Sequence, residues 1–152
     1  MLQQPSRIPF DQLNYNDDGL YVLVDFPYTG VAYREESDIL RYEQEYRNGL
    51  PWGKGLTWWD SGKLRLTMSY YEGALHGTKT ESDETGELLK EEVYEFGVIL
   101  VRRKRIESGG LVDEFRLRRS DPGFKTLSTL RNLYPDEVLN IDQMTPDLIR
   151  VE

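Results

Sequence analysis

The chain has 152 residues, a net charge of −8 and no cysteine. This length suits a single domain, and the absence of cysteine excludes disulfides and thiolate metal sites and favours a reducing cytoplasm. The acidic balance disfavours nucleic acid as a partner, because phosphate contacts draw on lysine and arginine.

We expect a soluble, cytoplasmic protein without stable membrane insertion. No apolar run of the sequence approaches the length that crosses a bilayer. Residues 1–5 lack the basic stretch and apolar core with which a secretory signal begins.

Residues 1–27 are predicted to lead into a repeat array. Prolines make residues 1–13 an irregular start, and residues 20–24 are rich in β-branched side chains and predict the first strand. The array is therefore expected to begin near residue 20. The apolar side chains expected to cover this end of the sheet are Ile8, Phe10 and Leu13.

A pattern with a 24-residue step occupies residues 28–117. The step relates columns of similar residues: Asp38, Gly62, Gly86 and Gly110; Leu40, Leu64 and Leu88; Tyr46, Tyr70 and Tyr94; Gly49, Gly73 and Gly97. A period of this size is typical of arrays in which one supersecondary unit is repeated.

Each repeat is predicted to be a β-hairpin. Residues 60–63, Asp-Ser-Gly-Lys, form a turn between two β-prone runs, because Gly62 can adopt positive φ. A lone hairpin is marginal in water, so the copies should pair edge to edge. The predicted fold is mainly β, a single-layer twisted antiparallel sheet of repeated hairpins. The copies span residues 30–46, 53–70, 77–94 and 101–117.

The repeat resembles the MORN-repeat variant found in bacterial antitoxin and immunity-like proteins. Residues 46–49 (YRNG) and 71–77 (YEGALHG) match it best, and the resemblance covers about residues 28–117. It implies a hairpin scaffold and a protein that neutralises a cognate toxin. Such scaffolds serve unrelated functions, so function has to be argued from a site.

The third copy interrupts the apolar stripe. Lys90 and Glu92 stand where Leu66 and Met68 stand in the second copy. Two interpretations are open: burial changes to the other face of the sheet, or a bulge resets the register.

Basic residues concentrate in the fourth copy, between Arg102 and Arg119. One interpretation is structural, with cross-strand pairs to the acidic third hairpin. The other is a patch that binds the phosphates of RNA or lipid.

Residues 118–152 are predicted to cap the array, whose last unit would otherwise expose an apolar face and a strand edge. Asp-Pro-Gly at residues 121–123 ends the repeat pattern. Leucines at helical spacing then predict a short amphipathic helix over residues 125–133, ended by Pro135. Residues 138–141 and 148–149 are expected to add apolar cover.

The sequence predicts no enzyme, cofactor or metal site. His76 is the only histidine, and the resemblance implies a structural His-Gly at its turn. Carboxylates occur in solvated runs such as Glu35-Glu36, and no glycine loop precedes a helix in the phosphate-binding manner.

Aromatic residues are abundant, with three Trp, ten Tyr and five Phe. One interpretation is that the rings cover sheet faces that no second layer shields. Trp58 and Trp59 are consecutive and are expected on opposite faces, so at least one should be exposed. Exposed aromatic side chains among carboxylates are typical of protein-binding hot spots. The predicted partner-binding residues are Tyr42, Glu43, Glu45, Tyr46, Trp58, Trp59, Asp60, Tyr70 and Tyr71.

These observations predict a non-catalytic protein-binding module, and the resemblance implies an antitoxin or immunity protein that blocks the active site of a cognate toxin. The acidic first hundred residues fit a basic toxin such as a nuclease. A toxin of another activity is equally open. The alternative is a MORN-type scaffold that binds anionic lipid or another protein, and a third interpretation is a carbohydrate-binding sheet. The face that binds and the oligomeric state stay open.

Overall fold

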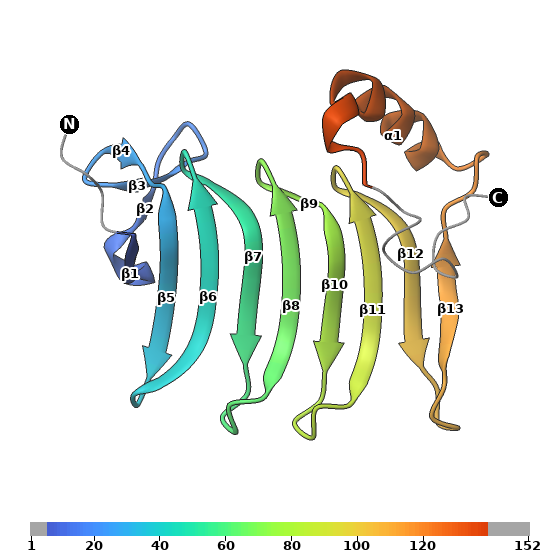
Figure 1. Cartoon of the computed structure of the whole chain (residues 1–152), viewed down its shortest axis with the longest axis horizontal. Coiled ribbons are helices and arrows are strands. Elements are labelled where there is room, and N and C mark those ends of the chain that lie inside the picture. Colours follow the sequence, from blue (N-terminus) through green and yellow to red (C-terminus); the bar gives the residue numbers. More distant parts are fainter. Residues whose placement is uncertain (1–5, 140–152) are drawn as a thin grey trace.

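The structure is a computed structural model that describes residues 6–139 (Figure 1). The main element is a ten-stranded sheet in the order β1-β5-β6-β7-β8-β10-β11-β12-β13, with β9 paired to β8. A small sheet of β2, β3 and β4 lies at its N-terminal end, and α1 lies at the opposite end (Figure 1). The predicted mainly β array of antiparallel hairpins with a C-terminal helix is confirmed.

The strands are β1 (Arg7–Pro9), β2 (Asn14–Tyr15), β3 (Tyr21–Leu23), β4 (Phe26–Pro27), β5 (Gly30–Glu36), β6 (Ile39–Arg47), β7 (Leu50–Trp58), β8 (Leu64–Tyr71), β9 (Ala74–Leu75), β10 (Gly77–Ser82), β11 (Leu88–Glu95), β12 (Val98–Arg105) and β13 (Leu111–Arg116). The helices are η1 (Phe10–Gln12), α1 (Pro122–Leu133) and η2 (Pro135–Glu137).

Two-residue turns recur every 24 residues at one end of the strands. Both residues of each turn have positive φ, which is the type I′ geometry that matches the twist of paired strands. The amide of Gly73 donates to the carbonyl of Pro51 and that of Gly97 to the carbonyl of Leu75. Each turn is thus bonded to the preceding hairpin. The turns are Val24-Asp25, Asn48-Gly49, Glu72-Gly73 and Phe96-Gly97.

Glycine turns recur at the other end of the strands. Gly62 and Gly86 have φ of 81° and 90°, and each amide donates to the carbonyl three residues earlier. In the fourth copy the same bond is made by Gly109, with φ of 94°. The 24-residue step had placed this turn at Gly110, so the fourth copy is one residue out of step.

A register shift lies near the turn at this end of the strands in each of the first three hairpins, the first of which turns at Ser37-Asp38. It falls between Arg34 and Glu35 in the first, Thr57 and Trp58 in the second, and Glu81 and Ser82 in the third. A bulge is therefore a property of the repeat and does not distinguish the third copy.

Cross-strand pairs divide the side chains between two faces, because residues opposite one another share a face. We call one the tyrosine face; a row on it contains Arg34, Tyr42, Thr57, Leu66, Glu81, Lys90 and Lys104. A row on the opposite face contains Tyr33, Glu43, Leu56, Thr67, Thr80, Glu91 and Arg103.

The N-terminal segment covers the tyrosine face over β5 and β6. Ile8 pairs with Ala32 and is buried with it. The Phe10 ring lies 5.7 Å from Tyr42, and Tyr21 lies 5.0 Å from Tyr46. Phe10 and Leu13 pack against this core as predicted.

Helix α1 covers the opposite face over β11 and β12. Its Leu127 is fully buried against Val93 and Val101. Arg131 donates twice to the buried carboxylate of Glu95 on β11, at 3.0 and 2.6 Å.

Because Val93 follows Glu92 in the strand, the two lie on opposite faces. Of the two interpretations of the third copy, the change of buried face accounts for the altered pattern.

The predicted start of the array is wrong. Residues 20–24 do contain a strand, but β3 turns back through Val24-Asp25 and pairs with β4 in the small sheet. Pro27 has no N–H to continue a ladder, so the array starts at β5. Arg7–Pro9, expected to be irregular, pairs parallel with β5.

The C-terminal prediction is close to the structure. Helix α1 begins at Pro122, three residues earlier than predicted, and ends at Leu133 before Pro135. Leu139 packs against the core beneath α1. Val138, also expected to add apolar cover, is exposed, so that part of the prediction is wrong. The rest of the expected cover, at residues 140–141 and 148–149, lies outside the described residues.

The turn glycines give a matched test of the packing between hairpins. Gly49 and Gly73 occupy the same turn position with φ of 80° and 82°. An alanine Cβ at Gly49 would lie 2.9 Å from the Tyr21 carbonyl oxygen, whereas at Gly73 its nearest neighbour is 3.5 Å away. We expect Gly73→Ala to cost about 1 kcal/mol for the left-handed backbone and Gly49→Ala at least about 1 kcal/mol more for the clash. Urea denaturation measures both, and equal losses would contradict this packing.

Candidate functional site

A band of the tyrosine face lies beside the area that the N-terminal segment covers, while α1 lies on the opposite face. The band contains Tyr42, Thr57, Leu66, Met68 and Tyr70, all half-buried. Over β7 and β8 the band presents apolar side chains and the Tyr70 ring without a covering layer among the described residues, and Tyr42 on β6 lies at its edge against Phe10. We call this the open band.

The structure brings three predicted tyrosines together. The hydroxyls of Tyr42 and Tyr46 lie 3.4 Å apart, and the Tyr70 hydroxyl donates to the sulfur of Met68 at 3.3 Å. Burial is the main cause that raises the pKa of each of these tyrosines. The hydroxyls therefore stay protonated at neutral pH and can both donate and accept hydrogen bonds. Tyr46 itself is buried and supports the other two.

The predicted acidic residues are not gathered around the tyrosines. Glu43 lies on the opposite face and pairs with Arg7. Asp60 lies at a hairpin turn and pairs with Arg41. These carboxylates have structural partners within the chain and do not form one acidic rim.

Glu45 and its neighbour Gln44 support an irregularity in the pairing of β6 with β7. The buried Gln44 side chain donates to the carbonyls of Glu45 and Trp52, at 2.8 and 3.4 Å. The Glu45 carboxylate accepts from the Lys54 amide at 3.3 Å. Buried backbone groups that lose ladder partners need such replacements. The sequence did not indicate this role of Gln44.

The consecutive tryptophans are both half-buried. The Trp59 indole donates to the Ser82 carbonyl at 3.0 Å, and the Arg65 guanidinium lies 4.6 Å from its ring centroid. Trp58 pairs with the exposed Leu64 beside a register shift. Trp59 thus has contacts that fix it within the sheet.

Tyr71 belongs to a second aromatic group, away from the open band. Its ring lies 4.9 Å from Trp52 and 5.6 Å from His76, and Phe96 lies 4.6 Å from His76. Tyr134, which follows α1, completes the group.

His76 has structural partners on both ring nitrogens. Nδ1 accepts from the Phe96 amide at 3.0 Å, and Nε2 lies 2.9 Å from the Glu137 carbonyl oxygen. Burial lowers the pKa of His76, which favours the neutral ring that these bonds require. The side chain holds the segment after α1 to the sheet, as a structural histidine would.

A charged cluster adjoins the open band on the same face. Glu92 is 1% exposed. Its Oε1 accepts from Arg102 Nε at 2.6 Å and lies 3.0 Å from Lys90 Nζ, and Lys79 Nζ lies 3.5 Å from Oε2. Burial by itself would raise the pKa of Glu92, but the bonds from Arg102 and Lys90 outweigh it and lower the pKa to about 2. The interrupted apolar stripe was the sequence signal for this cluster.

Five basic residues of the fourth copy face carboxylates across or along the strands, namely Arg102, Arg103, Lys104, Arg105 and Arg116. This arrangement fits the structural interpretation of the segment. The nitrogen–oxygen pairs include Arg103 with Asp113 at 3.2 Å, Lys104 with Glu114 at 2.7 Å, Arg105 with Glu87 at 2.9 Å and Arg116 with Asp113 at 2.7 Å.

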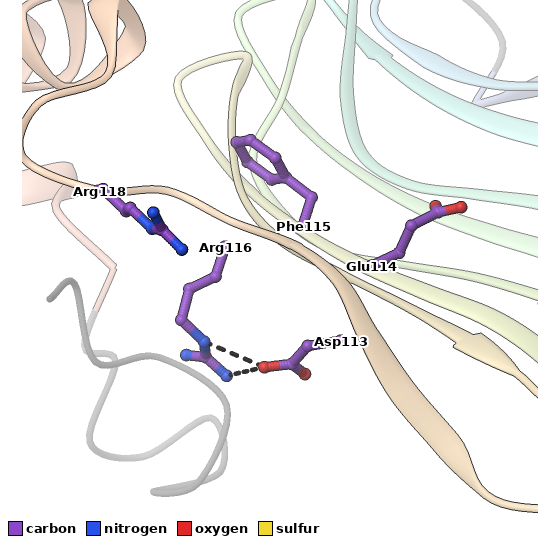
Figure 2. A pocket seen from close by; sticks show the side chains of 5 residues that line it. All are labelled: Asp113, Glu114, Phe115, Arg116 and Arg118. Atoms are coloured by element: carbon purple, nitrogen blue, oxygen red, sulfur yellow. Dashed lines mark hydrogen bonds and ion pairs between the residues drawn. The ribbon is translucent and has the colours of Figure 1, made fainter.

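Two shallow hollows lie on the surface. Figure 2 shows one of about 340 Å³ along β13, where Arg116 reaches Asp113 and Phe115 points away from this pair. The other, of about 350 Å³, lies beside Lys90 and Lys104. Neither hollow contains a histidine or a nucleophile poised beside a base.

Within residues 6–139, no group of three or more histidine, cysteine, aspartate or glutamate side chains is placed to hold a metal ion. No helix in this range is long and apolar enough to cross a membrane. Comparison of the chain with family models, curated proteins and solved structures gave no match.

The charged cluster predicts that substitutions of two neighbouring glutamates have very different effects on the free energy of unfolding. Glu92→Gln should lower the free energy of unfolding by about 3 kcal/mol at pH 7, because three cations lose their shared anion. Glu91→Gln, one residue earlier on the opposite face, should change it by about 0.5 kcal/mol or less. Urea denaturation with circular dichroism measures both.

The stability that Glu92 contributes should depend on pH in a defined direction. The pKa of Glu92 is lowered in the folded chain from 4.5 to about 2. Its contribution is therefore complete above pH 4.5 and is lost as the pH falls toward 2. The stability of the natural chain and of Glu92→Gln should converge over this range, and a constant difference down to pH 2 would contradict the assignment.

Proposed function

We propose that the protein is a non-catalytic module that binds another protein through the open band of its tyrosine face. The observation that carries this proposal is the coverage of the sheet. The N-terminal segment and α1 each cover one end on opposite faces, and the open band lies on the tyrosine face beside the N-terminal segment.

The chemistry of the open band suits a protein partner. Tyr42 and Tyr70 present large rings with polar hydroxyls, and Leu66 and Met68 present adaptable apolar side chains. Tyrosine and methionine are enriched at the centres of protein interfaces, where a few anchored side chains supply most of the binding energy. Neither of the two hollows among the described residues is lined by Tyr42, Leu66, Met68 or Tyr70, whereas small ligands occupy enclosed cavities.

We further propose that the partner is a toxin, whose active site the protein blocks in the cytoplasm. The resemblance of residues 28–117 to the MORN-repeat variant of antitoxin and immunity proteins supports this assignment. The net charge of −8 favours association with a basic toxin such as a nuclease.

The alternative scaffold that binds anionic lipid has less support. Such a surface should present basic residues in several copies of the repeat, and here they concentrate in one. In the fourth copy Arg102, Arg103, Lys104 and Arg105 each have a carboxylate partner.

The same substitution on each face tests the proposed surface. Thr57→Arg places a long cation in the open band, whereas Thr80→Arg places it on the opposite face. Thr57→Arg should weaken partner binding tenfold or more, which corresponds to about 1.4 kcal/mol or more, and Thr80→Arg should leave it unchanged. Surface plasmon resonance measures affinity, and a thermal melt of each variant checks the fold.

The partner for this measurement comes from a toxicity assay. Open reading frames beside the gene are expressed in a bacterial host, alone and together with this chain. One of them should arrest growth alone and be relieved by co-expression. Relief that survives Thr57→Arg but fails with Thr80→Arg would place binding on the opposite face, and no toxic neighbour would contradict the antitoxin assignment.

A further inference from the structure

We propose that the segment of the partner that docks beside the open band is acidic, and that its carboxylates bind the cations Lys79, Lys90, Arg102 and Lys104. This inference rests on the proposed function and specifies the chemistry of the same surface. It differs from the basic contact surface that the net charge alone favours.

The local charge of the tyrosine face has the opposite sign to the whole chain. Across β10 to β13 this face carries four cations, and the three carboxylates among them are Glu81, Glu92 and Glu114. Four minus three leaves +1, in a chain whose net charge is −8. The net charge of the chain, which acts at long range, and the charge of this surface thus have different signs. The local charge decides which groups of a partner pair with the surface.

Glu92 holds these cations in position. Its buried carboxylate gathers the head groups of Arg102, Lys90 and Lys79 within 2.6 to 3.5 Å. One buried anion is shared by three cations, so the group keeps positive charge with which a further anion can pair. Donors that are already ordered lose less side-chain entropy when a ligand binds.

The cations remain accessible. The side chains of Lys79 and Lys90 are each 28% exposed, that of Arg102 is 34% exposed and that of Lys104 is 52% exposed. Hydrogen bonds between charged groups are stronger than neutral ones, so an incoming carboxylate has suitable partners here.

An apolar area adjoins the cations. The hollow of about 350 Å³ beside Lys90 and Lys104 is also lined by the exposed side chains of Leu89 and Ile106. A protein segment that places an apolar side chain next to a carboxylate matches this combination. Glu81 and Glu107 also line the hollow, which favours pairing with individual carboxylates over pairing with the closely spaced phosphates of RNA.

Poly-L-glutamate and a single-stranded RNA of similar length serve as probes. Binding to the full chain is measured by isothermal titration calorimetry at low salt. We expect poly-L-glutamate to bind and RNA to bind more weakly. Binding of RNA in preference to poly-L-glutamate would overturn the proposal in favour of a phosphate site.

Variants that remove a positive or a negative charge show where poly-L-glutamate binds. Lys104→Gln should weaken poly-L-glutamate binding about threefold, and Glu81→Gln should strengthen it about threefold. The gain for Glu81→Gln cannot result from unfolding. Glu91→Gln removes the same charge from the opposite face and should have no effect. Equal effects of Glu81→Gln and Glu91→Gln would show a response to net charge alone and overturn the proposal.

The outcomes separate this inference from the proposed function. If the toxin partner loses affinity for Thr57→Arg but poly-L-glutamate does not bind, the open band is the interface and the acidic contact is wrong. If poly-L-glutamate binds as expected but Thr57→Arg keeps full affinity for the partner, the cation site exists and the proposed function of the band is wrong.

Discussion

A single-layer sheet has two faces, and within residues 6–139 two short segments cover parts of them. The hairpins pair edge to edge through backbone hydrogen bonds, which leaves the side chains of both faces without a second layer. The N-terminal segment and α1 provide separate cores at the two ends. Everything between them must be stable while partly exposed to water, and this requirement shapes the open band and the charged cluster.

The two cores lie on opposite faces, so the composition of the tyrosine face changes along the array. Near the N-terminal core its positions are tyrosines and apolar side chains. At Glu92 the same column holds a buried carboxylate among cations, while Val93 on the other face enters the core under α1. A buried ion cluster is stable only when every charge has partners, so this region tolerates few substitutions. It also orders cations at the surface where a partner can reach them.

The repeat was predictable from the sequence because local chemistry determines it. Positive φ at the turns requires glycine or asparagine at most copies, and the alternation of apolar residues gives the strands. The start of the array was not predictable, because residues 20–24 have the composition of a strand and only tertiary pairing assigns β3 to the small sheet. The site was partly predictable. Tyr42, Tyr46 and Tyr70 share a face through their positions in the repeat, whereas the separation of Glu43, Glu45 and Asp60 depends on long-range partners such as Arg7 and Arg41.

The central claim is that the two caps protect opposite faces and leave the open band accessible. Because the chain has no cysteine, single cysteines can report on each face through their rates of reaction with a maleimide. The account predicts fast labelling of Thr57→Cys and Thr80→Cys at the middle of the sheet, and slow labelling of Ala32→Cys and Val101→Cys beneath the two caps. Slow labelling at Thr57→Cys together with fast labelling at Ala32→Cys would contradict it.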